Sequence, residues 1–149
     1  MKILEFFESP GKSKWLRQIK ACEWGAAKLL AKLLTEDRFH ALLGEGGKLF
    51  LLTDGDMLVS FATLTVQDCV ADESLTPWIG FVHTAPKYRG QRCAGQVIDR
   101  ACQEAADMGA KQVYIATDHI GLYEKYGFTY LENRIDVYGE DSRIYAKYL

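Results

Sequence analysis

The residues from Pro86 to Gly95 combine small side chains and bases in an arrangement that suits an anion. Lys87, Arg89 and Arg92 supply positive charge, and the segment leads directly into a helical pattern. The first amides of a helix lack partners within the helix, and the helix dipole attracts negative charge to them. The segment therefore predicts a diphosphate-binding turn. A glycine-bearing turn before a helix can also do no more than reverse the chain, so this second interpretation stays open.

The composition of the turn narrows the choice of phosphate ligand. The turn consists of Arg89, Gly90, Gln91, Arg92, Cys93, Ala94 and Gly95. These residues match neither GxxxxGK[ST], which is typical of ATP-hydrolysing proteins, nor GxGxxG, which is typical of dinucleotide-binding ones. Coenzyme A is therefore the better candidate ligand.

Metal and thiol chemistry are not indicated. Cys22, Cys69, Cys93 and Cys102 form no CxxC pair, and the three histidines lack the spacing of a metal site. We expect no metal, and we expect the four cysteines to act as small buried hydrophobic residues rather than as nucleophiles.

The overall composition is that of an ordinary globular protein. The chain has 149 residues, 48% of them hydrophobic and 26% charged, with a formal net charge of −2. We expect one domain, 1–149, without a nucleic acid or membrane partner, because there is no broad basic field and no apolar run of about 20 residues. Acidic residues in Met1–Pro10 argue against a signal peptide, so a cytoplasmic location is expected.

In the N-terminal half, a first strand is predicted from Met1 to about Phe7, ending at a turn around Pro10. Two helices follow: one starts near an N-cap at Ser13, and the other spans about Ala26–Leu34. Next, Asp-Gly at residues 54–55 predicts a β-hairpin between the strands Lys48–Thr53 and Met57–Val66.

In the C-terminal half, a near-continuous apolar run predicts a central strand, Trp78–Thr84, before a helix that starts at Gly95. A strand at Gln112–Thr117, a short helix at about Ile120–Tyr126 and two strands separated at Gly139–Ser142 complete the order βααβββαβαββ. Ligands of such strand–helix–strand units bind beyond the carboxyl ends of the strands. The tail segments Ile135–Tyr138 and Arg143–Tyr148 are predicted to be exposed edges that could pair in a homodimer.

Two segments resemble the signatures of the GNAT superfamily of N-acetyltransferases. Arg89 and Ala94 match its pattern of Gln or Arg, two residues, Gly, one residue, then Gly or Ala, although Arg92 stands where the glycine is usual. Residues 121–128 look like its Leu-Tyr-Glu-x-x-Gly-Phe segment. The resemblance, close from about Pro77 to Phe128, implies an α/β (α+β) fold: a mixed, mostly antiparallel twisted sheet with parallel central strands four and five and helices on both faces.

The resemblance also implies a reaction and residue roles. Acetyl-CoA would be the co-substrate, and its acetyl group would pass directly to a primary amine of a small molecule or peptide in a ternary complex. Strands four and five would splay apart, with Val82, His83 and Thr84 beside the pantetheine arm. The turn would bind the diphosphate, and Tyr123 would be the general acid, unless it only packs in the interior. Tyr126 would lie either in the core or in a wall of the coenzyme site.

The general base is not evident from the sequence. Many family members place Glu or His early in strand four, but Trp78, Ile79 and Gly80 cannot accept a proton. Of the carboxylates in the preceding loop, Asp68, Asp72 and Glu73, we rank Glu73 first, acting through water. Trp15, Trp24 and Trp78 are each expected either in the core or beside the acceptor.

Two other functions stay open at this point. A noncatalytic module that binds or senses acyl-CoA would explain Arg92 and the missing base. An ordinary α/β nucleotide-binding domain could share only the phosphate turn. The acceptor could be a polyamine, an amino acid, an antibiotic or a protein amine, because a net charge of −2 is too small to choose among them.

Overall fold

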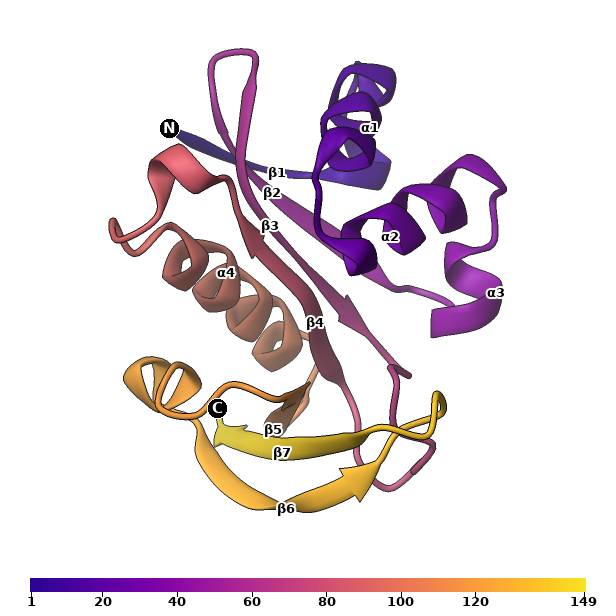
Figure 1. Cartoon of the computed structure of the whole chain (residues 1–149), viewed down its shortest axis with the longest axis vertical. Coiled ribbons are helices and arrows are strands. Elements are labelled where there is room, and N and C mark those ends of the chain that lie inside the picture. Colours follow the sequence, from indigo (N-terminus) through magenta and orange to yellow (C-terminus); the bar gives the residue numbers. More distant parts are fainter.

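Seven strands form one sheet in the order β1-β2-β3-β4-β5-β7-β6 in the computed structural model, which describes residues 1–149 (Figure 1). All neighbouring strands are antiparallel except β4 and β5, which are parallel. The strands are β1 Lys2–Glu5, β2 Lys48–Asp54, β3 Met57–Thr65, β4 Trp78–Thr84, β5 Gln112–Thr117, β6 Thr129–Ile135 and β7 Asp141–Tyr148. The predicted mixed sheet with a parallel central pair is confirmed.

Helices cover both faces of this sheet (Figure 1). On one face lie α1 Lys12–Ala21, α2 Gly25–Thr35 and α3 Phe39–Leu43, and on the other lies α4 Cys93–Asp107. Short 3₁₀ helices span Phe6–Glu8, Pro86–Tyr88 and Tyr123–Tyr126. No helix combines the length and apolar character needed to cross a membrane.

Each face has its own hydrophobic core. Residues of α4, including Val97, Ile98 and Ala101, pack against Phe50 and Ile79 of the sheet. On the opposite face, residues of α1–α3 pack against alternate residues of the same strands; this second core includes Trp15, Ile19, Leu30, Phe39, Leu49, Leu51 and Phe61. The alternation follows the two-residue period of a strand, so β2 and β3 are buried on both sides. Trp15 is therefore a core residue.

Several predicted boundaries were wrong for local reasons. Helix α1 begins at Lys12, and its N-cap is Gly11 in a left-handed conformation rather than Ser13. Helix α4 begins at Cys93, two residues before the predicted start at Gly95. The sequence analysis also missed α3, whose five residues are too few to show a helical period.

The predicted edge at Arg143–Tyr148 was also wrong. Strand β7, which contains this segment, pairs with β5 on one side and with β6 on the other. The exposed edge at this end of the sheet is β6, whose residues are mostly exposed. The chain returns from β6 into the interior of the sheet, an order that strand patterns alone do not reveal.

Strands β4 and β5 pair only at one end. Trp78 and Tyr114 are the single register pair between them, and beyond it the strands diverge (Figure 1). A bulge contributes to this divergence, because the pairing of β3 with β4 shifts register between Phe61 and Thr63. Opposite this shift, Phe81 has a left-handed φ of 50°. The bulge leaves part of the β4 backbone facing an open gap beside β5.

Candidate active site

Two cavities adjoin along β4 at this gap. The first, of about 740 Å³, is here called the turn groove; Val82, Arg89, Ala94 and Tyr123 are among its lining residues. The second, of about 1090 Å³, is here called the acidic cavity, and its acidic lining consists of Asp68, Asp72, Glu73, Asp118, Asp136, Glu140 and Asp141. Trp24 lines both cavities, whereas Phe81 lines the second and Val82 the first. The gap between β4 and β5 thus lies where the two cavities meet.

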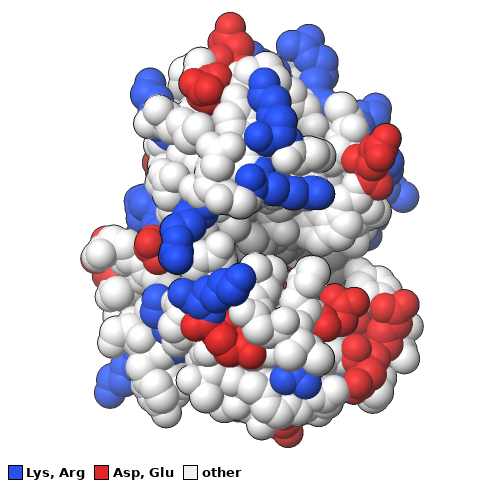
Figure 2. All heavy atoms as spheres, turned by 60° about the vertical axis from the view of Figure 1, so that its left-hand side comes forward, with Lys and Arg blue, Asp and Glu red and all other residues white.

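The helix start in the turn groove is suited to an anion. Arg92 is the N-cap of α4, and no side chain caps the helix. The first-turn amides of α4 are therefore not satisfied by a capping side chain. Arg89, Arg92 and Lys125 line the same groove, and Figure 2 shows basic side chains on both sides of a hollow on this face. Backbone donors and positive charge converge there, as a diphosphate site requires.

The backbone conformation at Arg92 explains why the GNAT motif that this turn resembles usually has glycine at this position. Arg92 adopts a left-handed conformation with φ of 59°, and Gly90 has φ of 78°. For a residue other than glycine, this conformation costs roughly 1–2 kcal/mol of conformational free energy. Arg92 therefore adds a charge to the groove at a cost in backbone strain.

Two contacts fix the shape of the turn groove. The Arg89 guanidinium donates a hydrogen bond through Nε to the Thr84 carbonyl (3.2 Å), which ties the turn to the end of β4. At the start of α4, a Cβ on Gly95 would lie 2.9 Å from the Tyr126 ring. Gly95 thus lets Tyr126 pack closely against the helix and form a wall of the groove.

Most of the predicted coenzyme residues line this groove. The structure brings together Val82, His83, Thr84, Arg89, Gly90, Arg92, Cys93, Ala94, Tyr123 and Tyr126. Gln91 and Gly95 do not line it, and the Cys93 side chain is buried in the core, so Cys93 can contribute only its backbone. Residues that the sequence analysis did not assign to this site are Trp24, Tyr88, His119, Leu122 and Lys125. Of these, Leu122 and Lys125 could have been found from their places in the second motif.

Tyr123 is held at the base of the groove by aromatic packing. Its ring lies 6.1 Å from that of Phe128 and 6.4 Å from that of Tyr145, and only 6% of the residue is exposed. Burial raises the pKa of Tyr123 to about 12, so its phenol keeps its proton at neutral pH. The hydroxyl makes no hydrogen bond within the chain and is free to donate one.

His83 forms part of an aromatic wall. It stacks on Trp24 with ring centroids 5.5 Å apart and contacts Phe61 at 5.3 Å. Burial and the nearby Arg89 charge lower the pKa of His83, so the imidazole is neutral at neutral pH. This stack connects the N-cap residue of α2 to β4. Trp24 lines both cavities and is partly exposed, so it lies at the site rather than in the core.

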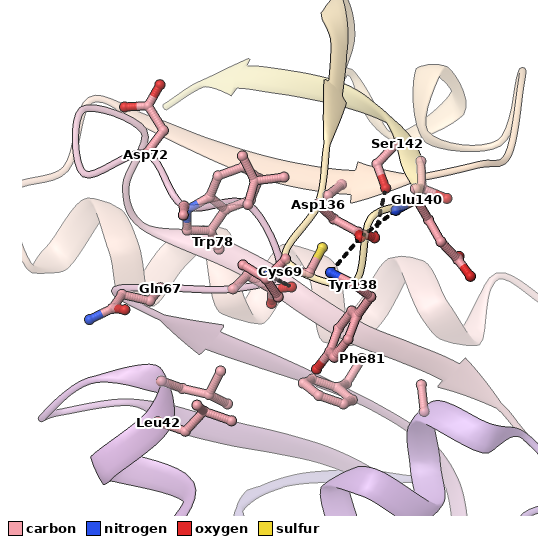
Figure 3. A pocket seen from close by; sticks show the side chains of 18 of the residues that line it. Leu42, Gln67, Cys69, Asp72, Trp78, Phe81, Asp136, Tyr138, Glu140 and Ser142 are labelled. Carbon is pink, nitrogen blue, oxygen red and sulfur yellow. Dashed lines mark hydrogen bonds between the residues drawn. The ribbon is translucent and has the colours of Figure 1, made fainter.

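The acidic cavity has no Lys or Arg among its lining residues. Three of its seven carboxylates bind other parts of the chain, and one of them, Asp141, accepts a hydrogen bond from the Asn133 side-chain amide (2.7 Å). Asp136 accepts backbone hydrogen bonds from Tyr138 (2.9 Å) and Glu140 (3.0 Å) within the β6–β7 turn (Figure 3), and Asp72 forms an ion pair with Arg134 of β6. Hydrogen bonds from Ser74, followed by the contact with Arg134, lower the pKa of Asp72 to about 2.

Three other carboxylates of the cavity lack partners in the chain. Glu73, Asp118 and Glu140 form no side-chain hydrogen bond or ion pair that would neutralise them, and all three are exposed. Asp68 differs from these three: its Oδ1 accepts a hydrogen bond from the Cys69 amide (2.7 Å), while its Oδ2 is enclosed without a partner. Burial raises the pKa of the Asp68 carboxyl. The predicted base Glu73 lies in this cavity but on its exposed side.

Solved structures with the same fold cover nearly the whole chain. A GNAT family acetyltransferase from Elizabethkingia anophelis with acetyl-CoA bound is 18% identical, with 99% of this chain and 97% of that chain covered and a TM-score of 0.69. The aminoglycoside 6'-N-acetyltransferase from Enterococcus faecium is 14% identical over the same shares, with a TM-score of 0.70. An acetyltransferase from Streptococcus agalactiae is 23% identical, covers 99% and 98%, and has a TM-score of 0.66.

A search among curated proteins found no match. The model of the acetyltransferase (GNAT) domain matches residues 26–131, more than two thirds of the chain. This match includes the turn, the splayed strands and the Tyr123 segment, so a nucleotide-binding domain that shares only the turn is ruled out. The chain belongs to the GNAT acetyltransferase family.

Proposed function

We propose that the protein transfers the acetyl group of acetyl-CoA directly to a primary amine of a small polycationic molecule. The observation that carries this proposal is the meeting of the turn groove and the acidic cavity at the gap beside β4. One cavity is suited to a polyanionic coenzyme and the other to a cationic acceptor. Both substrates would be bound at once, so no covalent enzyme intermediate is required.

The residues of the turn groove fit coenzyme A. The first amides of α4, together with Arg89 and Arg92, would hold the diphosphate, and Tyr126 would pack beside it. The bulge leaves the β4 backbone near Val82 to face the pantetheine arm and thioester. Acetyl-CoA supplies a thioester whose carbonyl carbon accepts the amine. A backbone N–H of this strand would stabilise the negative charge that develops on the carbonyl oxygen.

Tyr123 would donate a proton to the departing sulfur. Its phenol is protonated at neutral pH, has no hydrogen-bond partner in the chain and lines the turn groove. A positioned general acid contributes about 10²–10⁴-fold to rate. Tyr123 is thus the residue of this groove best suited to the role.

The charge of the acidic cavity favours an acceptor with several positive charges. Glu73, Asp118 and Glu140 are not neutralised within the chain, and none of the lining residues is basic. A monocationic amine would satisfy only one of them. The aminoglycoside 6'-N-acetyltransferase with the same fold points to the same class of small polyamine acceptor.

Two measurements test this function. Calorimetry with purified protein should detect binding of CoA and acetyl-CoA, and thiol release should be measured with aminoglycosides, spermidine, neutral amino acids and lysine peptides. We expect release with the polycationic small molecules at low salt and a decrease as salt screens the cavity. Tight CoA binding with no release for any amine would instead indicate a noncatalytic acyl-CoA-binding module. No binding of either coenzyme form would refute the proposal.

A further inference from the structure

Three buried side-chain polar atoms have no hydrogen-bond partner: Thr63 Oγ1, Asp68 Oδ2 and Trp78 Nε1. An enclosed polar atom without a partner costs free energy, most of all when it carries charge. Two of the three, the Thr63 hydroxyl and the Asp68 carboxylate oxygen, lie against Gly80 of β4. The cost is therefore concentrated at one place on the strand that faces the gap.

The Asp68 carboxylate occupies the space that a side chain at Gly80 would fill. A Cβ built on Gly80 would overlap with Asp68 Oδ2 and lie 3.3 Å from Thr63 Oγ1. Only glycine at position 80 leaves room for this arrangement. A carboxyl group thus stands over the early part of β4, although no residue at positions 78–80 carries one.

We propose that Asp68 is the catalytic base, which accepts a proton from the acceptor's ammonium group over Gly80. This inference rests on the proposed acetyl transfer and names a residue for one of its steps. Asp68 lines the acidic cavity, and a rotation of its carboxyl group would present the unpartnered Oδ2, which is enclosed against Gly80, to a bound amine. One residue further along β4, Phe81 begins the bulge, so the carboxylate is placed close to the thioester position.

The proton transfers balance across the reaction. An ammonium group, R–NH₃⁺, gives one proton to the Asp68 carboxylate and becomes R–NH₂, which can attack. Its nitrogen forms a bond to the thioester carbon, the carbon–sulfur bond breaks with its electron pair on sulfur, and Tyr123 donates a proton to that sulfur. The nitrogen releases a second proton, which restores Tyr123, and Asp68 returns its proton to water.

The environment of Asp68 distinguishes it from the other two loop carboxylates. Asp72 is engaged by Arg134 and Ser74, and Glu73 is exposed. The titratable groups that face Asp68 are the Cys69 thiol and, beyond it, Asp136 of the β6–β7 turn, neither of which is a cation. Burial therefore raises the pKa of Asp68 toward the working pH, where a base is most effective.

The isosteric variant Asp68→Asn tests the assignment. We expect kcat to fall by about 10²-fold or more, with a change of less than about two-fold in the KM for acetyl-CoA. The acidic limb of the pH–rate profile, where wild-type activity declines as Asp68 is protonated, should disappear. Glu73→Gln makes the same chemical change in the same loop and should raise the KM for the acceptor while lowering kcat less than about three-fold. The activity of the wild-type protein is measured alongside. No acetyl transfer by the wild type would refute the proposed function, whereas an active wild type with an equally active Asp68→Asn would refute only the role of Asp68.

Stability provides a second readout. A carboxyl whose pKa is raised in the folded state stabilises the protein at low pH, and this contribution is lost as pH rises through the folded pKa. Asp68→Asn should therefore raise the thermal midpoint relative to wild type at pH 7 and less so at pH 4. A midpoint below that of wild type at pH 7 would show that the carboxylate mainly holds the loop. That result, or a kcat above one tenth of wild type, would overturn the proposal.

Exchanging the two residues gives a gain-of-function test. Asp68→Gly alone should be nearly inactive, and adding Gly80→Asp returns a carboxylate to the same space from β4. We expect the double variant to regain at least about ten-fold in kcat over Asp68→Gly. Equal activity of the single and double variants would count against a base at this place.

Discussion

The turn groove and the acidic cavity adjoin along β4, yet they are built in different ways. The groove is formed by the end of β4, the start of the 15-residue helix α4, the turn between them and the segment after β5, and α4 is fixed by the core beneath it. The acidic wall of the cavity comes largely from the β3–β4 loop and the β6–β7 turn, which are tied together by the Val137 amide bonded to the Cys69 carbonyl (2.8 Å). The groove is thus anchored on a long helix and a central strand, whereas the acidic wall consists largely of loops.

This difference in construction indicates that the two sites recognise their ligands in different ways. A coenzyme common to a whole family can be held by backbone amides, which do not depend on side-chain identity. An acceptor that differs between relatives must be recognised by side chains, and loops tolerate changes in these without cost to the core. The comparison therefore predicts that changes in the groove affect the coenzyme and changes in the cavity affect the acceptor.

The largest effect is expected for Tyr123, the proposed proton donor of the turn groove. Tyr123→Phe should lower kcat by about 10²-fold, because the departing sulfur loses its proton donor while the ring still packs against Phe128. The dissociation constant for CoA, measured by calorimetry, should change by less than about two-fold, since the diphosphate contacts lie in the turn. Tyr130→Phe on the exposed edge strand is the matched control and should leave kcat unchanged. Retention of full turnover by Tyr123→Phe would remove it from the mechanism.

A change confined to the acidic wall should act on the acceptor alone. Replacing Glu73 and Glu140 by Gln and Asp118 by Asn removes three carboxylates that are not neutralised within the chain. An exposed ion pair between one such carboxylate and a bound cation contributes up to about 1 kcal/mol to binding. We expect the KM for a polycationic amine to rise about ten-fold or more and its salt dependence to weaken. The KM for acetyl-CoA is the internal control. An equal rise in both constants would contradict the separation of the two sides.

A change beneath the groove should act on the coenzyme alone. Gly95→Ala places a methyl group against the Tyr126 ring, so the ring must shift into the groove. Such overpacking typically lowers the free energy of unfolding by about 1–3 kcal/mol. We expect weaker CoA binding by roughly five- to ten-fold and an unchanged KM ratio among acceptor amines. Gly25→Ala is the matched control, because a methyl group there meets no atom within 4 Å. CoA affinity that is insensitive to Gly95→Ala would show that Tyr126 is not a wall of the site.

The sequence predicted the groove better than the cavity, for the same structural reason. Trp78–Thr84 and Gln112–Thr117 were predicted at their observed bounds because a buried strand leaves a continuous apolar run. The turn and Tyr123 were predicted from local spacing, and the structure brings them together in one groove. The approach of Asp68 to Gly80, across 12 residues of the β3–β4 loop and the start of β4, leaves no such pattern. The placement of β7 between β5 and β6 leaves none either. Long-range packing and strand order thus account for the Asp68 contact and the position of β7, whereas α3 was missed because it is short.

The smallest effect is expected for Arg92, which stands at a position where the GNAT motif usually has glycine. Arg92→Gly removes both a charge and the strain of a left-handed φ of 59°, whereas Arg92→Ala removes the charge and keeps the strain. We expect the glycine variant to be more stable than the alanine variant by roughly 1 kcal/mol, or a few degrees in thermal midpoint. Both should weaken CoA binding slightly and to the same extent, because the lost charge is the same. If only the alanine variant weakened binding, the backbone conformation rather than the guanidinium would be what Arg92 contributes, and the groove would rely on backbone geometry at this position too.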